Sequence, residues 1–261
     1  MERELSNEAS VETEVLTVLV ALILKSGPEP IWVTVDGHDR TALIFLPSVP
    51  SEHPPVIFAF HGHGGNSRQA SRSFGMQDAW PEAVVVYPQG LPTKSALVDP
   101  QGQFPGWMVD ANDQNPDVRF FDALYTRVMK KVNGDPKRVF AMGHSNGGFF
   151  MYTLWAMRPD KFAAFGSAEA AGAGRFSLTP KPIFITIGSQ DNIVPPALQR
   201  RSLNYVFKAD GSSPTGERFG EKGTLYNGTA PVVVWNYDGT HTFPRDSVPS
   251  MVKFFQRSTR P

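Results

Sequence analysis

The sequence predicts an α/β protein with one mostly parallel central sheet and helices on both of its faces. Short apolar runs rich in β-branched and aromatic residues alternate with helical stretches along most of the 261 residues. Apolar residues make up 41% of the chain, which suffices for one sizeable core. We therefore expect residues 31–261 to form a single catalytic domain, preceded by an N-terminal segment of residues 1–30.

Residues 15–24 (VLTVLVALIL) form an apolar run with the length of a signal-peptide core, too short to span a bilayer as a helix. The residues before it are dominated by glutamate instead of Lys or Arg, and no A-x-A-like cleavage site follows. Two interpretations stay open, a degraded or wrongly started export signal and an ordinary helix or strand. We expect a secreted or periplasmic protein without stable membrane insertion, with a cytoplasmic location as the alternative.

From Ile31 onward the elements follow in order. The first is a hairpin with its turn near Asp36-Gly37. The runs VIFAF and AVVVYP then predict two buried parallel strands, because both are continuously apolar and lead into glycine-containing loops. Residues 117–132 carry apolar side chains at helical spacing, and Asn133-Gly134 follows as a stop, so an amphipathic helix is expected there.

The second half of the chain repeats this alternation. Strands are expected in RVFAMG, KFAAFGSAEA, PIFITIG and PVVVWNY, and helices over residues 147–157 and 195–207. Residues 90–116 and 209–229 show little periodicity and are expected to be long loops. Such loops inside compact domains are usually functional or mobile.

Charge and cysteine content exclude several classes of function. Lys plus Arg equals Asp plus Glu at 25 each, so nothing favours nucleic acid or an anionic membrane as a partner. The absence of cysteine excludes disulfides, thiolate metal sites and a cysteine nucleophile. No interaction motif is present, and a monomer is the default expectation.

The segment Gly143-His144-Ser145-Asn146-Gly147 carries the sharpest chemical signal. It is a G-x-S-x-G motif placed directly after a predicted strand and directly before a predicted helix. In a nucleophile elbow the chain turns so sharply that glycines must flank the serine, and the helix supplies backbone N–H groups nearby. This context predicts Ser145 as the nucleophile of an α/β-hydrolase fold.

A serine hydroxyl needs a base, and an acid must orient that base. On this fold the chain order is Ser, then Asp or Glu, then His. His241 is the only histidine after Ser145 and lies in a loop after a predicted strand, which makes it the expected base. Asp191 follows another predicted strand and is the expected acid, although it could instead cap the next helix. Asp238 and Glu169 are alternative acids.

An acyl-transfer site also needs donors for the oxyanion. The segment from His61 to Asn66 (HGHGGN) follows a predicted strand, and its small residues would let the backbone approach a substrate. We assign the oxyanion hole to the backbone N–H groups of His63 and Asn146. Reading His61 and His63 as a metal pair has thin support, since no third histidine or cysteine lies near them in sequence. No metal is expected.

Two further residues are assigned to substrate binding. His144 neighbours the nucleophile on the elbow. Trp107 lies in the loop over residues 90–116 and could wall the acyl or alcohol pocket, although plain packing under the loop is an equal alternative. Phe149 and Phe150 are expected in the core.

These residues resemble the bacterial esterases that include polyhydroxybutyrate depolymerases and feruloyl or acetylxylan esterases related to carbohydrate esterase family 1. The matching segments span most of residues 56–244 and are VIFAFHGHGGN, VVVYPQG, GWMVD, DVRFFDAL, DPKRVFAMGHSNGGFFMYTLWAMRPDKFAAF, IGSQDNIVPP and DGTHTFP. The resemblance implies a triad of Ser145, His241 and Asp191, no metal or organic cofactor, and usually an exported enzyme. Members often carry cysteines near the catalytic loops, whereas this chain has none, and its acidic N-terminus also departs from the family pattern.

We therefore expect a serine carboxylic-ester hydrolase that forms an acyl-enzyme. Its substrate would be a small-molecule or polymer-linked ester, such as feruloyl or acetyl esters of plant polysaccharide or a polyhydroxyalkanoate. A serine peptidase and a catalytically inactive ligand-binding protein are the alternatives, because one fold supports many functions.

Overall fold

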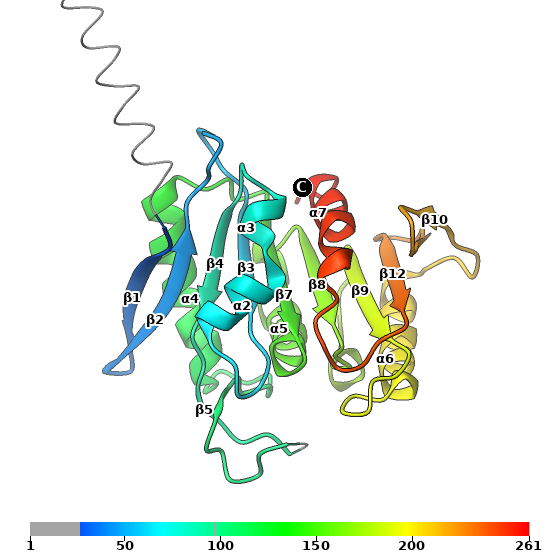
Figure 1. The fold of residues 1–261 in the computed structure, drawn as a ribbon, viewed down its shortest axis with the longest axis horizontal. Helices are drawn as coiled ribbons and strands as arrows, with labels where there is room; N and C mark the ends of the chain where they lie inside the picture. The colour runs from blue at the N-terminus through cyan, green and yellow to red at the C-terminus, as the bar shows by residue number, and fades with distance from the viewer. Residues whose placement is uncertain (1–26, 97, 261) are drawn as a thin grey trace, which may run out of the picture.

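The computed structural model describes residues 27–96 and 98–260 (Figure 1). Its strands are β1 (Glu29–Val35), β2 (His38–Phe45), β3 (Val56–Phe60), β4 (Val84–Pro88), β5 (Leu91–Pro92), β6 (Pro105–Gly106), β7 (Val139–His144), β8 (Ala164–Ala168), β9 (Ile183–Gly188), β10 (Glu217–Phe219), β11 (Gly223–Tyr226) and β12 (Val232–Tyr237). The α-helices are α2 (Ser67–Phe74), α3 (Met76–Ala79), α4 (Pro116–Val132), α5 (Asn146–Met157), α6 (Pro196–Asp210) and α7 (Val248–Gln256). The short 3₁₀ helices are η1 (Pro159–Lys161), η2 (Ala173–Arg175) and η3 (Arg245–Ser247).

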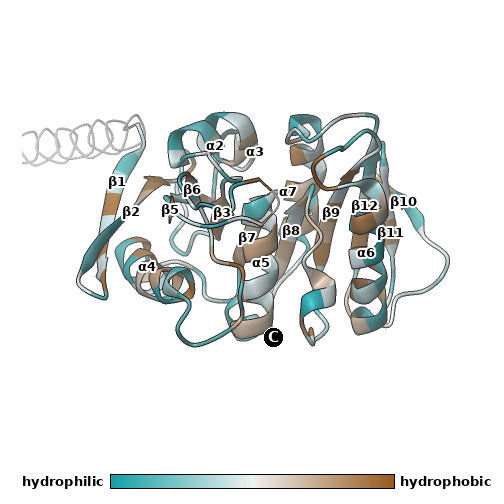
Figure 2. Ribbon diagram, turned by 90° about the horizontal axis from the view of Figure 1, so that it is seen from below, coloured by the Kyte–Doolittle hydropathy of each residue, from teal (hydrophilic) through white to brown (hydrophobic). Residues whose placement is uncertain are grey.

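Ten strands form one sheet in the order β1-β2-β4-β3-β7-β8-β9-β12-β11-β10. The strands from β4 to β12 in that order are parallel, and an antiparallel pair continues the sheet on each side. Figure 2 shows the apolar strands between two helical layers, with α2, α3 and α7 on one face and α4, α5 and α6 on the other. The predicted mostly parallel sheet with helices on both faces is confirmed. The parallel strands all end at one edge of the sheet, where loops can bring distant residues together.

Both faces of the sheet carry a hydrophobic core. Side chains from α4, α5 and α6 pack on one face, among them Phe121, Phe150 and Leu203. Side chains from α2 and α7 pack on the other face, among them Phe74 and Phe255. Because the central strands are covered on both faces, their sequences are continuously apolar and do not alternate.

The N-terminal hairpin turns at Asp36 and Gly37, which have φ values of 52° and 77°. Strand β1 begins at Glu29, two residues before the predicted start of the domain. The predicted export signal over residues 15–24 lies outside the described residues. Helix α4 confirms the expected amphipathic helix, and it ends at Asn133, which adopts the left-handed conformation.

The expectation of an irregular loop over residues 209–229 is wrong in part. Strands β10 and β11 lie within it and extend the sheet beyond β12. They are only three and four residues long, so they carry no detectable periodicity and are defined by pairing with their neighbours. The stretch 90–116 likewise contains the short pair β5 and β6.

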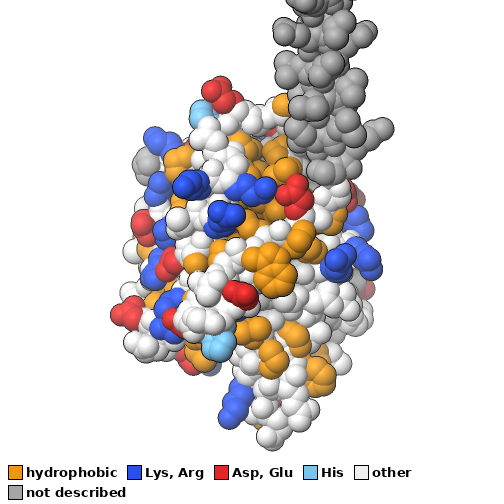
Figure 3. All heavy atoms as spheres, turned by 90° about the vertical axis from the view of Figure 1, so that its left-hand side faces the viewer, with side chains coloured by type: hydrophobic (Ala, Val, Ile, Leu, Met, Phe, Trp, Pro, Cys, Tyr) orange, Lys and Arg blue, Asp and Glu red, His pale blue; other side chains and the backbone are white. Residues whose placement is uncertain are grey.

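Charges of both signs mix on the surface. Figure 3, which views the side where β1 lies, shows Lys and Arg side chains interspersed with Asp and Glu. This agrees with the zero formal net charge. Within the described ranges, none of the helices has the length and apolar character needed to cross a membrane.

Candidate active site

Ser145 sits at the sharp turn between β7 and α5. Its φ of 53° and ψ of −123° fall in a region that residues with a Cβ atom rarely adopt. Two glycines make the turn sterically feasible. A Cβ atom at Gly143 would lie 2.2 Å from the carbonyl oxygen of Gly147, and one at Gly147 would lie 2.2 Å from that of Phe60. The strained backbone therefore presents the Ser145 hydroxyl at the carboxyl edge of the sheet.

The structure brings the three predicted triad residues together. The distance from Ser145 Oγ to His241 Nε2 is 2.7 Å, and His241 Nδ1 lies 2.8 Å from Asp191 Oδ2. The Asp191 side chain is fully buried, and that of His241 is 15% exposed. A neutral imidazole that donates from Nδ1 to the carboxylate keeps a lone pair on Nε2, which can accept the hydroxyl proton. The arrangement is that of a nucleophile, a base and an orienting acid.

Asp191 also holds the loop on which it lies. Its Oδ1 accepts the backbone N–H groups of Ile193 and Val194 at 2.9 and 2.8 Å. Its Oδ2 accepts a 2.9 Å hydrogen bond from Nε2 of Gln199 besides the one from His241. Asp191 is not the N-cap residue of the next helix, because Pro195 occupies the N-cap position of α6. Sequence reasoning missed Gln199, although it lies on the first turns of a predicted helix.

The two alternative acids lie in different environments. Asp238 is exposed and accepts hydrogen bonds from Ser189 and Gln190, which hold its pKa below the ordinary value. Glu169 is fully buried after β8, and burial raises its pKa to about 8 against the hydrogen bond from Thr186. A carboxyl group that is protonated at neutral pH cannot balance the charge of an imidazolium. Asp191 therefore fits the role of the acid best.

His144 lies beside the triad. Burial and the neighbouring His241 lower the pKa of His144 to about 3, so its ring is neutral. The centroids of the two rings are 5.1 Å apart. Its Nε2 lies 3.5 Å from Oε2 of Glu169. His144 also lines a hollow next to Ser145. This position suits its predicted role in substrate binding, which stays a prediction.

The two residues predicted for the oxyanion hole flank Ser145 in one cavity. Asn146 is the first residue of α5, where backbone N–H groups have no partner within the helix. The side chain of Asn146 is held by the backbone of Trp107, from which it accepts at 2.7 Å and to which it donates at 3.1 Å. His63 Nε2 lies 3.0 Å from Asp99 Oδ2, and the acceptor-only carboxylate assigns the proton to the ring.

Asp99 was not predicted as part of the site. Burial alone would raise its pKa, but hydrogen bonds from the Phe104 N–H and from His63 outweigh it and lower the pKa to about 2. Asp99 lies 36 residues after His63, and only the folded loop brings the two together.

The expected role of Trp107 as a wall of the substrate pocket is wrong. Its side chain is fully buried, stacks on Phe150 with centroids 5.3 Å apart, and donates from Nε1 to the His61 carbonyl at 2.8 Å. Under the loop, the ring is buried against other aromatic side chains and its N–H group has a hydrogen-bond acceptor. Phe149, expected in the core, instead lines the cavity at Ser145, whereas Phe150 is buried as expected.

Both ring nitrogens of His61 have partners within the protein. Nδ1 donates to the Gly62 carbonyl at 2.8 Å, and Nε2 accepts the Gly90 N–H at 3.0 Å. Burial lowers the pKa of His61 to about 4, which matches a neutral structural ring. Among residues 27–96 and 98–260, no three His, Asp or Glu side chains gather closely enough to hold a metal ion.

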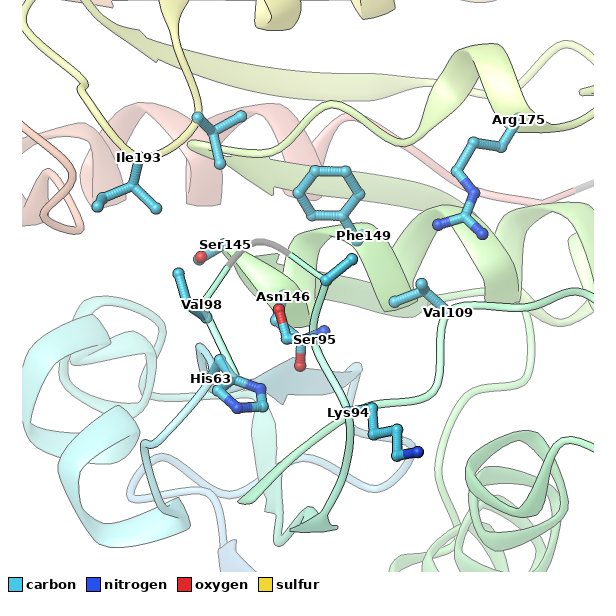
Figure 4. A pocket seen from close by; sticks show the side chains of 12 residues that line it. His63, Lys94, Ser95, Val98, Val109, Ser145, Asn146, Phe149, Arg175 and Ile193 are labelled. Carbon is cyan, nitrogen blue, oxygen red and sulfur yellow. The ribbon is translucent and has the colours of Figure 1, made fainter. Parts of the chain in front are cut away.

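Two hollows meet at Ser145. One is a cavity of about 140 Å³ with Phe149, Ile193 and Lys94 among its lining residues (Figure 4). The other has a volume of about 520 Å³ and is lined by His241, His144 and Phe243, among others. An ester bound across Ser145 would have room on both sides of its carbonyl carbon.

Comparison with known proteins gives the site a family context. The bifunctional acetylxylan esterase/xylanase XynS20E of Neocallimastix patriciarum is 27% identical over 60% of this chain and 22% of that protein. Feruloyl esterase D of Neurospora crassa is 27% identical over 73% of this chain and 66% of that protein. The chain thus spans between about a fifth and two thirds of the length of these relatives.

Solved structures share the fold at low sequence identity. An acetyl xylan esterase from Aspergillus awamori superposes with a TM-score of 0.57 at 17% identity, covering 87% of this chain and 99% of that one. A ferulic acid esterase gives a TM-score of 0.64 at 14% identity, covering 88% and 98%. The predicted α/β-hydrolase fold and the predicted relation to feruloyl and acetylxylan esterases are confirmed.

A family model described as acetyl xylan esterase (AXE1) matches residues 31–165. The matched region includes Ser145, His63 and Asn146, and it ends before Asp191 and His241. It covers 135 of the 261 residues, which is more than half of the chain. The chain belongs to the acetyl xylan esterase (AXE1) family.

Proposed function

We propose that the protein is a serine carboxylic-ester hydrolase that removes feruloyl or acetyl groups from plant polysaccharide through an acyl-enzyme. The observation that carries this proposal is the continuous hydrogen-bond path from Ser145 through His241 to Asp191, with links of 2.7 and 2.8 Å. The names of the relatives, acetylxylan esterase and feruloyl esterase, support the substrate class.

In the first step, Ser145 Oγ attacks the ester carbonyl carbon while His241 Nε2 takes the hydroxyl proton. The oxyanion that forms accepts hydrogen bonds from the N–H groups of His63 and Asn146, and Asp191 stabilises the imidazolium. His241 then gives its proton to the alcohol oxygen, and the C–O bond of the ester breaks. In the second step, water attacks the acyl-enzyme with the same proton transfers, and the carboxylic acid leaves.

The first experiment compares wild type with Ser145→Ala. Alanine keeps the Cβ atom, so the strained turn is unchanged and only the hydroxyl is lost. The panel consists of p-nitrophenyl acetate, methyl ferulate, acetylated xylan and a hydroxybutyrate oligomer. We expect wild type to hydrolyse one or more esters and Ser145→Ala to lose at least about a thousandfold in kcat. Ser250→Ala, a serine change on α7, is the matched control and should keep the wild-type rate.

The alternatives predict different results. A peptidase would cleave peptide substrates and could hydrolyse the activated p-nitrophenyl ester, but it would leave methyl ferulate and acetylated xylan nearly untouched. An inactive binding protein would not react with a fluorophosphonate probe. If the enzyme hydrolyses only the hydroxybutyrate oligomer of the panel, the substrate class is a polyester and not a polysaccharide ester.

Location and assembly are also part of the proposal. An intact polysaccharide does not enter a cell, so we propose that the enzyme acts outside the cytoplasm. We also propose that the enzyme is a monomer. Cell fractionation with an immunoblot and light scattering after gel filtration test the two statements. Recovery in the cytoplasmic fraction, or the mass of a dimer, would contradict them.

A further inference from the structure

The two hollows at Ser145 differ in their access to His241. The 520 Å³ hollow is lined by His241, whereas His241 is absent from the described residues that line the 140 Å³ cavity. In the reaction proposed above, His241 protonates the departing alcohol, so the alcohol oxygen must lie within hydrogen-bond reach of Nε2. The alcohol side of the ester therefore occupies the larger hollow, and the acyl group occupies the smaller cavity. This assignment rests on the proposed function.

The cavity assigned to the acyl group has apolar walls next to the nucleophile. Phe149 comes from α5, Val98 from the loop after β5, and Ile193 and Val194 from the loop before α6. An acetyl group extends only one methyl carbon beyond the carbonyl, and it would leave most of this cavity unfilled. A longer apolar acyl group would bury more surface, worth about 0.8 kcal/mol per CH₂ group in general.

The opposite end of the same cavity is cationic. In Figure 4, Ser145 lies at one end, and the side chains of Lys94 and Arg175 border the other. Arg175 forms an ion pair with Asp110 at 2.9 Å, and its side chain is 43% exposed. Within the described part of the chain, Lys94 has no carboxylate at ion-pair distance. These three side chains leave a net charge of +1 at the end of the cavity that faces away from the ester.

The loop that carries Lys94 is braced from within and against the predicted oxyanion hole. Backbone N–H and C=O groups of Ser95 and Asp99 are paired in both directions at 2.9 Å. Gly102, at φ 73°, packs so closely on the stem of Lys94 that a Cβ atom there would lie 2.9 Å from its Cγ. The carboxylate of Asp99 accepts from the Gly102 N–H and binds the ring of His63 at 3.0 Å. The backbone and the base of the Lys94 side chain are therefore held in place at this end of the cavity.

We propose that this cavity selects acyl groups that are apolar next to the ester and carry an oxygen acceptor at the far end, most strongly an anionic one, which Lys94 and Arg175 bind. A carboxylate would form charge-assisted hydrogen bonds with both cations, whereas a phenolic oxygen would form weaker neutral ones. Lys94 and Arg175 are specificity-determining residues in this proposal and take no part in bond breaking.

Three methyl esters that share a cinnamoyl core and differ at its far end test the proposal: methyl cinnamate, methyl ferulate, and the ester of 4-carboxycinnamic acid that is methylated on the propenoate side. We expect kcat/KM for the carboxylated ester to exceed that for methyl cinnamate about tenfold, a typical ratio for one charge-assisted hydrogen bond, with methyl ferulate between them. The ratio should shrink in 1 M NaCl, because exposed cations are screened by salt.

Variants identify the residues responsible. Lys94→Met should lower the ratio of carboxylated to plain ester to near one, and Arg175→Met should lower it less, because Asp110 already pairs with that guanidinium. Lys94→Glu should reverse the preference toward methyl 4-(aminomethyl)cinnamate, a gain that a misfolded protein cannot show. Lys130→Met is the matched control. Lys130 is exposed in the last turn of α4, at the edge of the sheet opposite Ser145.

The outcomes separate the inference from the proposed function. If wild type hydrolyses the three esters equally, or if the Lys94 variants keep the wild-type ratio, the inference is wrong and the esterase proposal stands. If wild type hydrolyses no ester, including p-nitrophenyl acetate, the proposed function fails and the inference fails with it.

Discussion

At the scale of single residues, Asp191 divides its hydrogen bonds between structure and chemistry. One carboxylate oxygen fixes the backbone of the loop before α6, and the other faces His241 and Gln199. A buried carboxylate that accepts hydrogen bonds from this many donors keeps one orientation. The His241 ring is thereby held in the tautomer that leaves Nε2 open toward Ser145.

Asp191→Asn should therefore lower kcat by about 10³–10⁴, since an amide can hold the ring in the wrong tautomer and cannot balance an imidazolium. Initial rates on p-nitrophenyl acetate measure this effect. Asp238→Asn is the matched control, because Asp238 lies three residues before His241 and accepts its hydrogen bonds from Ser189 and Gln190. A larger loss in the Asp238 variant would reassign the acid.

Glu169 gives a prediction on stability and pH. Burial raises its pKa from 4.5 to about 8. Between these values the unfolded chain ionises while the folded protein keeps the proton, so the free energy of unfolding falls as pH rises and levels off above about pH 8. Glu169→Gln removes this titration. Between the two pKa values, the free energy of unfolding of the variant should rise relative to that of wild type by up to about 1.4 kcal/mol for each pH unit.

Urea denaturation at pH 5, 6.5 and 8 measures the difference. Glu52→Gln, at an exposed glutamate whose side chain is 90% accessible, is the matched control and should follow wild type at all three values. If the free energy of unfolding changes with pH equally in wild type and in Glu169→Gln, Glu169 is ionised in the folded protein.

At the scale of elements, the start of α4 anchors the loop that leads to it. The side chain of the buried Asn115 accepts the N–H groups of Asp117 and Val118 and donates to the carbonyls of Met108 and Asp110. One residue thus caps the helix and closes the preceding loop. At α2 the N-cap Asn66 is less buried and accepts one backbone N–H, from Gln69.

Asn115→Ala should cost about 3 kcal/mol in the free energy of unfolding, because loss of the cap and of two buried carbonyl partners combine. Asn66→Ala should cost about 1 kcal/mol as a simple cap. Thermal unfolding of both variants by circular dichroism gives the comparison. Equal losses would mean that the loop before α4 contributes no stability through Asn115.

At the scale of the whole molecule, the sheet separates two cores. Val128 of α4 packs in one and Val252 of α7 in the other. Replacing either by alanine should cost about 2 kcal/mol through lost burial and a small cavity. Since the two residues belong to different core clusters, the double variant should lose the sum within about 0.5 kcal/mol. Chemical denaturation of the four proteins tests this, and a larger deviation would show that the sheet transmits strain between its faces.

Much of this architecture was predictable from sequence because the central strands are buried on both faces and are therefore continuously apolar. The elbow was predictable because backbone contacts at Gly143 and Gly147 exclude any side chain. Strands β10 and β11 were not, since three or four residues give no period. Their strand character depends on partners that are distant in sequence.

Within the candidate site, the triad residues follow from order and position, whereas their supporting partners do not. Gln199 and Asp99 acquire their roles only when loops from different strands meet. Trp107 and Phe149 show the same limit for apolar residues. Sequence marks both as hydrophobic, but the fold decides that Trp107 packs in the core and Phe149 lines the cavity.

The backbone at Ser145 also limits which amino acids could replace this residue. Threonine carries the same hydroxyl group, but its branched Cβ is strongly disfavoured at a positive φ such as the 53° observed here. An evolutionary exchange between the two alcohols, common on protein surfaces, is therefore closed at this position. The turn tolerates substitution of Ser145 by alanine or glycine, which removes the hydroxyl group, but it disfavours substitution by threonine, which would keep it.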